Sequence, residues 1–157
     1  MRFFLMLIIG FIVTGCTTVP LSQDKLWRNP NNETAKVLFY RPSGSHTKAV
    51  KLYFGVEDNY AVGLKEKEFT WLYIPVGKYT FSYKPPGHKA EFSEIEISSE
   101  EINCLALKAG AKGWARLLLS PAITGDVGFY SLIKGKCLEE EEINNYSYVD
   151  VKMQQEE

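Results

Sequence analysis

From Ala35 onward, apolar and polar residues alternate with a period of two, which predicts β-strands rather than helices. Residues 79–84 show this most clearly. Tyr79, Phe81 and Tyr83 alternate there with Thr, Ser and Lys, so we expect Tyr79 and Phe81 in the main core. Residues 69–74 alternate aromatic residues with aliphatic residues or threonine, so both faces are expected to be buried, with Trp71 in the main core. Further strands are expected at 37–40, 50–56, 60–64, 92–97, 102–108, 114–120 and 129–133.

Loop signals separate these strands at roughly ten-residue intervals. Residues 75–78, Pro-Val-Gly-Lys, predict a tight turn with Gly77 at positive φ. The pattern predicts an all-β fold over residues 35–149, an antiparallel β-sandwich of about seven to eight short strands. A short C-terminal helix is expected at 138–146, where acidic residues near its start suit the helix dipole. Residues 150–157 are expected to form a disordered tail.

The N-terminal residues have the pattern of an export signal. A single cation, Arg2, precedes the apolar run 3–13, which is too short to span a bilayer. The next residues, Val-Thr-Gly-Cys, resemble the bacterial lipobox, whose cysteine receives a diacylglycerol and becomes the first residue of the mature protein. Cys16 is therefore the expected lipidation site and residues 1–15 the signal peptide, because a thiolate is the nucleophile that this chemistry needs. An ordinary secretory peptide with an incidental cysteine is the alternative.

Residues 16–34 are expected to form the lipidated cysteine and a flexible tether, because they are polar and contain Pro20 and Pro30. As a coil, the tether would span on the order of 20–25 Å. Two or three acyl chains, such as palmitate, would anchor the chain essentially permanently without a transmembrane helix. Thr17 stands where an Asp would favour the inner membrane in enteric lipoproteins. The expected location is therefore the outer membrane, facing the periplasm.

Composition restricts the partners. The 157 residues carry a formal net charge of −1, and loss of residues 1–15 removes Arg2 but no acid. There is no basic stripe, so nucleic acid is not an expected partner. Residues 108–113 combine lysines with glycines but lack the spacing of a phosphate-binding loop, so we expect a hairpin loop there. The length fits one domain.

Two further cysteines, Cys104 and Cys137, form a possible disulfide, because an exported chain meets an oxidising compartment. This bond would close a loop of about 34 residues and contribute roughly 4 kcal/mol. Alternatively, Cys104 is simply a core residue of an apolar strand. Arg41, at a strand end before Pro42, is expected to pair with a buried carboxylate or to hold the carbonyls of a turn, rather than to bind a ligand.

The sequence favours neither catalysis nor a cofactor. His46 and His88 lie in loops without carboxylates or thiols at ligand spacing, so no metal site is expected. Ser43 and Ser45 beside His46 could be parts of a hydrolase, but the nucleophile-elbow motif is absent. Acidic residues 139–142 are expected to be a solvated helix face rather than a cation site. No catalytic residue is assigned.

Two segments carry a resemblance to a known family. Residues 38–44, Leu-Phe-Tyr-Arg-Pro-Ser-Gly, and residues 74–81, Ile-Pro-Val-Gly-Lys-Tyr-Thr-Phe, resemble small bacterial lipoproteins classed as domain of unknown function 2846. The resemblance covers roughly residues 36–119, and it implies a small sandwich on a lipid anchor with no established activity. The chain departs from the family at residues 57–59, Glu-Asp-Asn, where an Asp-Gly turn is usual.

Three functions follow as hypotheses. The first is a non-enzymatic binding or structural module, held at the membrane by its lipid, whose partner is an envelope protein or peptidoglycan. An exposed sheet edge or aromatic patch would favour it. The second is a cell-envelope hydrolase, which needs a cleft with convergent titratable groups. The third is a carrier of lipid or a small ligand, which needs an apolar cavity between the sheets.

The lipid anchor generates the first prediction. In cells that express the Cys16→Ser variant, processing at the lipobox and acylation should both fail, because serine cannot replace the thiolate. Fractionation should show the wild-type chain in the membrane pellet at its processed size. A Cys16→Ser chain that remains in that pellet at the processed size would show that the anchor assignment is wrong.

Overall fold

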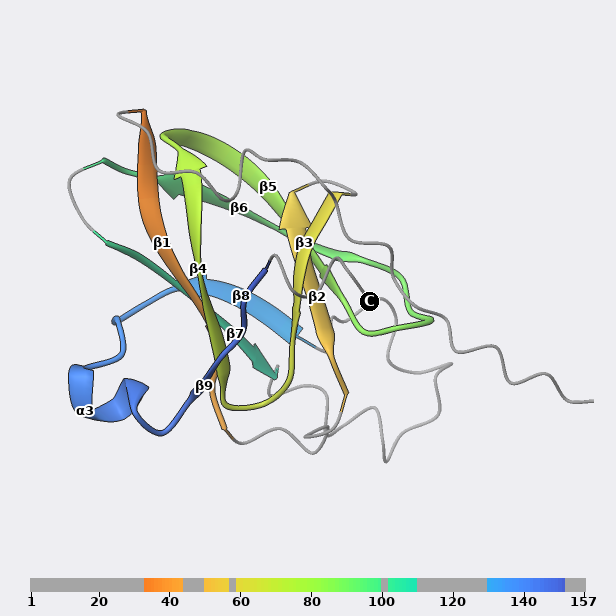
Figure 1. The fold of residues 1–157 in the computed structure, drawn as a ribbon. Coiled ribbons are helices and arrows are strands. Elements are labelled where there is room, and N and C mark those ends of the chain that lie inside the picture. The colour runs from red at the N-terminus through yellow and green to blue at the C-terminus, as the bar shows by residue number, and fades with distance from the viewer. Residues whose placement is uncertain (1–32, 44–49, 57–58, 100–101, 110–129, 152–157) are drawn as a thin grey trace, which may run out of the picture.

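Two β-sheets pack face to face in the computed structural model, which describes residues 33–43, 50–56, 59–99, 102–109 and 130–151 (Figure 1). The elements in chain order are β1 (Thr34–Arg41), β2 (Leu52–Val56), β3 (Asn59–Leu64), β4 (Glu68–Pro75), β5 (Gly77–Lys84), β6 (Glu91–Ile97), β7 (Asn103–Ala109), β8 (Tyr130–Lys134), α3 (Glu140–Ile143) and β9 (Ser147–Tyr148). The expected all-β sandwich with a short C-terminal helix is confirmed. The strand expected at 114–120 lies outside the described residues.

The two sheets have the strand orders β8-β7-β1-β4-β9 and β3-β2-β5-β6. Five of the pairings are antiparallel, but β1 pairs with β7, and β4 with β9, in parallel. The expected antiparallel pairing therefore holds for five pairs, and these two parallel pairs are exceptions to it. The physical reason is that side-chain alternation reports which residues share a face, and it carries no information about the direction of the neighbouring strand.

Aromatic rings join the two sheets at the centre of the main core. The rings of Phe39 in β1 and Phe54 in β2 stack with centroids 3.8 Å apart, and Phe81 in β5 stacks on Phe54 at 5.2 Å. All three side chains are fully buried. Tyr79 is half-buried and packs against this cluster. The expectation for Phe81 is confirmed, and Tyr79 lies at the edge of the core.

The outer face of the five-stranded sheet carries a second apolar cluster. Leu38, Tyr40, Phe69, Cys104 and Ala106 are buried there beneath residues 136–146, which we call the C-terminal strap. Both faces of β4 are thus packed, as its sequence predicts. Trp71, however, is half-buried against the second cluster, so its expected place in the main core is wrong. Thr70, Leu72 and Ile74 point inward, so the alternation along β4 turns Trp71 to the outer face of the sheet.

Some boundaries also differ from expectation. The helix covers only Glu140–Ile143 instead of 138–146, and β9 was not expected. Val151, which the sequence assigned to a tail, is buried in the main core, whereas residues 152–157 lie outside the described part. Gly77 has φ 156°, a conformation that residues with a side chain rarely adopt, as the turn signal predicted.

The strand directions give the sandwich two distinct ends. At the first, which we call the loop end, β1, β3, β5 and β7 finish and β2, β4, β6 and β8 begin. At the second, which we call the tether end, the chain enters β1 and turns from β4 into β5. The backbone N–H of Val76 donates to the carbonyl of Glu33 there, at 3.2 Å.

The aromatic stack generates the second prediction. Phe81→Ala should lower the free energy of unfolding by about 3–5 kcal/mol, because the ring is fully buried between Phe54 and Tyr79 and its loss leaves a cavity. Urea unfolding followed by circular dichroism measures this change. Thr80→Ala, at the exposed neighbouring position, is the matched control and should change the value little. Equal midpoints for both variants would remove Phe81 from the core.

Candidate functional site

At the loop end, β1, β3, β5 and β7 finish and β2, β4, β6 and β8 begin, and the described turns β3–β4 and β5–β6 lie there (Figure 1). Connections at one end of a β-sandwich commonly carry binding residues, because the rigid sheets hold them in place while their sequences vary. The loop end is therefore the candidate functional site. Its architecture depends on one buried cation.

Arg41, at the end of β1, is only 1% exposed. Its Nη1 donates to the carbonyl of Val50, just before β2, and to that of Leu64 at the end of β3, the latter at 3.3 Å. Because β1 belongs to one sheet and β2 and β3 to the other, the guanidinium joins the sheets. The expected role of Arg41 as a clamp on carbonyls is confirmed.

The electrostatic surroundings of Arg41 explain how a charge remains buried there. Burial lowers the pKa of Arg41 from its usual value, while Tyr130, Glu66 and Glu68 oppose that change. The guanidinium carbon also lies 6.0 Å from the centre of the Tyr130 ring, within the range of a cation–π contact. Arg41 stays protonated at neutral pH because an arginine pKa begins far above 7.

A second set of polar side chains closes the loop end between β5, β6 and β8. The Tyr83 hydroxyl lies 3.3 Å from the Ser93 hydroxyl and donates to the carbonyl of Tyr130 at 3.4 Å. The Glu91 carboxylate accepts the backbone N–H of Tyr130 at 3.2 Å. The sequence identified Tyr83 only as an apolar strand residue. No local signal shows that its hydroxyl crosses to the other sheet.

The backbone of the turn from β3 into β4 is strained. Lys67 has φ 59°, in the left-handed region that residues other than Gly, Asn and Asp seldom occupy. Its N–H donates to the carbonyl of Arg41 at 2.9 Å, and its carbonyl accepts the N–H of Ser147 at 2.9 Å. Strain of this kind costs about 1 kcal/mol or more and persists where surrounding contacts impose it, often at binding sites.

The other sequence candidates are dispersed. His88 is exposed in the β5–β6 turn, where its backbone N–H donates to the carbonyl of Pro85, and Ser43 is exposed just after β1. His46, Ser45 and Lys112 lie outside the described residues, and Lys108 is exposed on β7. Within the ranges that the structure describes, no three His, Cys, Asp or Glu side chains are grouped to hold a metal ion.

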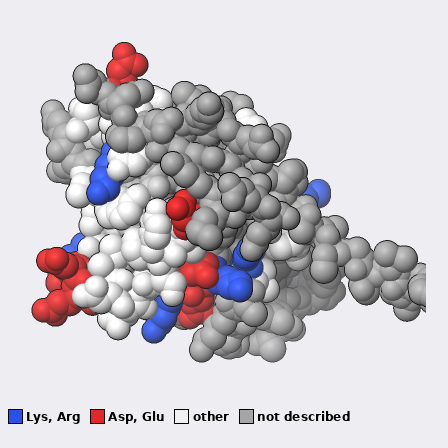
Figure 2. All heavy atoms as spheres, viewed as in Figure 1, with Lys and Arg blue, Asp and Glu red and all other residues white. Residues whose placement is uncertain are grey.

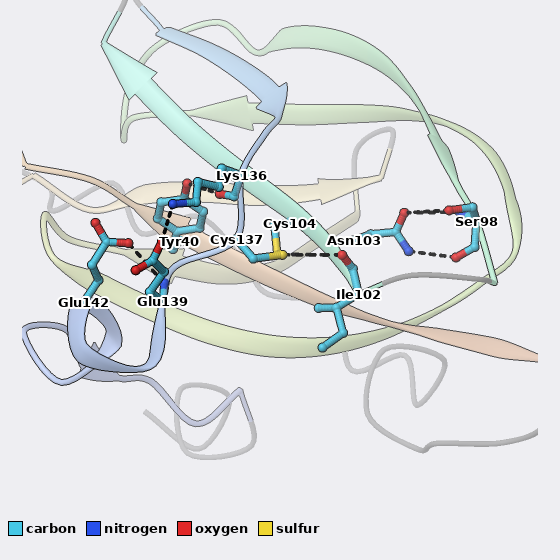
Figure 3. Close-up of a disulfide and its surroundings, with 9 residues drawn as sticks. All are labelled: Tyr40, Ser98, Ile102, Asn103, Cys104, Lys136, Cys137, Glu139 and Glu142. Atoms are coloured by element: carbon cyan, nitrogen blue, oxygen red, sulfur yellow. Dashed lines mark hydrogen bonds and ion pairs between the residues drawn. A yellow bond between two sulfur atoms is a disulfide. The ribbon is translucent and has the colours of Figure 1, made fainter.

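Cys104 of β7 and Cys137 are joined in a disulfide, with their Cα atoms 5.1 Å apart (Figure 3). Cys104 is therefore both a buried member of the second cluster and a cross-link. Two hydrogen bonds reinforce this attachment. The N–H of Gly135 donates to the carbonyl of Cys104 at 3.0 Å, and the Tyr40 hydroxyl donates to the carbonyl of Lys136 at 3.1 Å. Together they hold the start of the C-terminal strap against the sheet.

The rest of the C-terminal strap covers the sheet with side chains. The rings of Tyr146 and Tyr40 meet edge to face with centroids 6.1 Å apart. Burial raises the pKa of both hydroxyls, and Glu142 raises them further. The Glu142 carboxylate also accepts the N–H of Glu139, and Glu139 pairs with Lys136 on the surface. The acidic side chains of α3 are exposed and gather at one corner in Figure 2, as expected for a solvated helix face.

No family model matches the chain, and no curated protein and no solved structure matches it. Cys16 and residues 17–32 of the expected tether lie outside the described residues, whereas Thr34, the last residue assigned to the tether, begins β1. Among the described helices, none has the length and apolar character needed to cross a bilayer. On the face shown in Figure 2, the described Lys and Arg side chains are scattered rather than gathered into one basic patch.

The disulfide generates the third prediction. Reduction should lower the free energy of unfolding by about 4 kcal/mol, because the bond closes a loop with a sequence separation of 33 residues. The measurement is urea unfolding of the same wild-type chain with and without a dithiol reductant. The Cys104→Ala/Cys137→Ala variant is the control, and the reductant should leave its midpoint unchanged. A wild-type midpoint that does not respond to reduction would contradict the prediction.

Proposed function

We propose that this protein is a lipid-anchored bacterial envelope protein that binds another envelope component, a protein or peptidoglycan, through its loop end and without chemical turnover. The observation that carries the proposal is the Arg41 clamp. A buried guanidinium is costly unless hydrogen bonds satisfy it, and here it joins both sheets beneath the connections of the loop end. The result is a rigid base for surface turns.

The surface of the loop end supports a polar contact. Lys65 and Lys67 are exposed on the β3–β4 turn, and His88 and Lys89 are exposed on the β5–β6 turn. The hydrogen bonds of the Lys67 backbone to Arg41 and Ser147 hold this turn in one conformation, so its side chains are presented without a large loss of entropy on binding. A partner with carboxylates would complement the three lysines.

The anchor part of the proposal rests on the lipobox at residues 13–16 and on the polar segment that follows it. The resemblance to the lipoproteins with domain of unknown function 2846 is likewise part of the proposal, and the sandwich is the fold that it implies. A surface-bound module of this kind would work from the periplasmic face of the outer membrane.

Site-specific photo-cross-linking in intact cells tests the proposal and gives the fourth prediction. Benzoylphenylalanine at position 89, on the exposed β5–β6 turn, should give an adduct of defined mass with an envelope protein or with peptidoglycan. The same residue at position 80, exposed on the sheet face, is the matched control and should give none. Lys67→Gly should weaken the adduct, because glycine suits φ 59° and only the ammonium is lost.

Three results would overturn the binding function. Equal adducts from positions 89 and 80 would mean that the loop end is not selective. Turnover of peptidoglycan, phospholipid or ester substrates by the purified chain, lost in His88→Ala or His46→Ala, would establish the hydrolase alternative. Lipid that copurifies with the chain in stoichiometric amount, and that survives delipidation of the anchor, would instead establish the carrier alternative.

A further inference from the structure

Five residues on the outer face of the five-stranded sheet and at the adjoining tether end form a mixed aromatic and aliphatic surface, which we call the interfacial patch: Lys36, Trp71, Tyr73, Val76 and Ile102. Val76 is 49% and Ile102 is 53% exposed, although both are aliphatic. Trp71 and Tyr73 are half-buried on the outer face of β4, and Lys36 is exposed on β1. Single exposed apolar residues are ordinary on a protein surface, and Phe92 and Tyr148, each 56% exposed, lie elsewhere. Val76 and Ile102 differ because they lie toward the same end as the outward aromatic residues of β4.

Strand register brings these residues together. Lys36 lies opposite Tyr73 in the β1–β4 pair, and its Nζ stands 4.0 Å above the Trp71 ring. Ile102 directly precedes Asn103, which pairs with Val37, so Ile102 reaches the same end of the sheet as Lys36. The turn that carries Val76 is hydrogen-bonded to Glu33, next to the start of β1.

The chemistry of the interfacial patch is that of a membrane–water boundary. Tryptophan and tyrosine are favoured there because each has an apolar body and a polar group. Lysine extends its apolar stem into the boundary while its ammonium stays in water. The exposed valine and isoleucine, on separate turns, supply the apolar atoms that would enter the headgroup region.

The point where the chain enters β1 indicates that a lipid surface covers the interfacial patch. Glu33 is the first described residue, and the segment that leads back to Cys16 departs from it, beside Val76. A tether on the order of 20–25 Å in span keeps this end of the domain near the lipid, which raises the effective concentration of the interfacial patch at the bilayer. A free protein partner would gain no such advantage.

We infer that the interfacial patch docks on the surface of the membrane that holds the lipid anchor, so that the sandwich stands on its tether end. This inference rests on the proposed anchor. The loop end, on the opposite side of the sandwich, then faces away from the bilayer and is accessible to a partner. The Lys36 ammonium lies at the level of the lipid phosphates, while Val76 and Ile102 enter between the headgroups.

The test uses the lipidated full chain in vesicles of phosphatidylethanolamine and phosphatidylglycerol, with benzoylphenylalanine at position 76 or 102. The vesicle-bound fraction is isolated before irradiation, and lipid adducts are measured by mass spectrometry. The matched control is position 92, because Phe92 is 56% exposed but lies on β6 close to the loop end. Lipid adducts from positions 76 and 102 should exceed those from position 92 several-fold.

The outcomes separate docking from anchoring. A chain that is recovered with the vesicles but gives equal lipid adducts at positions 76, 102 and 92 overturns docking and leaves the anchor intact. Adducts with a second protein or with added peptidoglycan, in place of lipid, at positions 76 and 102 also overturn it. A chain absent from the vesicle fraction overturns the anchor and, with it, this inference.

Discussion

Burial of β1 on both faces is the constraint on which the rest of the structure depends. Its inward residues Val37 and Phe39 enter the main core, and its outward residues Leu38 and Tyr40 would be exposed to water if the sheet ended there. Since exposed apolar faces are unfavourable, a third layer must cover the outer side. The C-terminal strap provides it, and the disulfide to Cys104 fixes it in place.

The same strand ends in the buried guanidinium of Arg41. An apolar residue there could fill the space, but it could not satisfy the carbonyls of Val50 and Leu64, which both lie on the side of the four-stranded sheet. Hydrogen bonds thus replace apolar contacts where the core reaches the loop end. The strained turn at Lys67, bonded to the carbonyl of Arg41, depends on this arrangement as well.

The two ends of the sandwich differ in chemistry in a way that suits an anchored binding module. The tether end exposes Val76 and Ile102 near the chain entry, whereas the loop end exposes lysines over a hydrogen-bonded base, together with the rings of Phe92 and Tyr148. In the proposed orientation, the first would lie against lipid and the second would face the periplasm. The disulfide suits an oxidising compartment, because its bond would stabilise the C-terminal strap there without a large additional core.

Local pattern alone determined that the chain forms β-strands, where most strands lie, that Phe81 is in the core and that Gly77 needs a positive φ. These features follow from the alternation of apolar and polar residues and from the residues that favour turns, and both depend only on neighbours in the sequence. Tertiary structure decided that β1 and β7 run parallel, that Trp71 faces the C-terminal strap, that Cys104 meets Cys137, and that the Tyr83 hydroxyl reaches β8. Each joins residues distant in sequence, and alternation is the same whichever strand or layer becomes the partner.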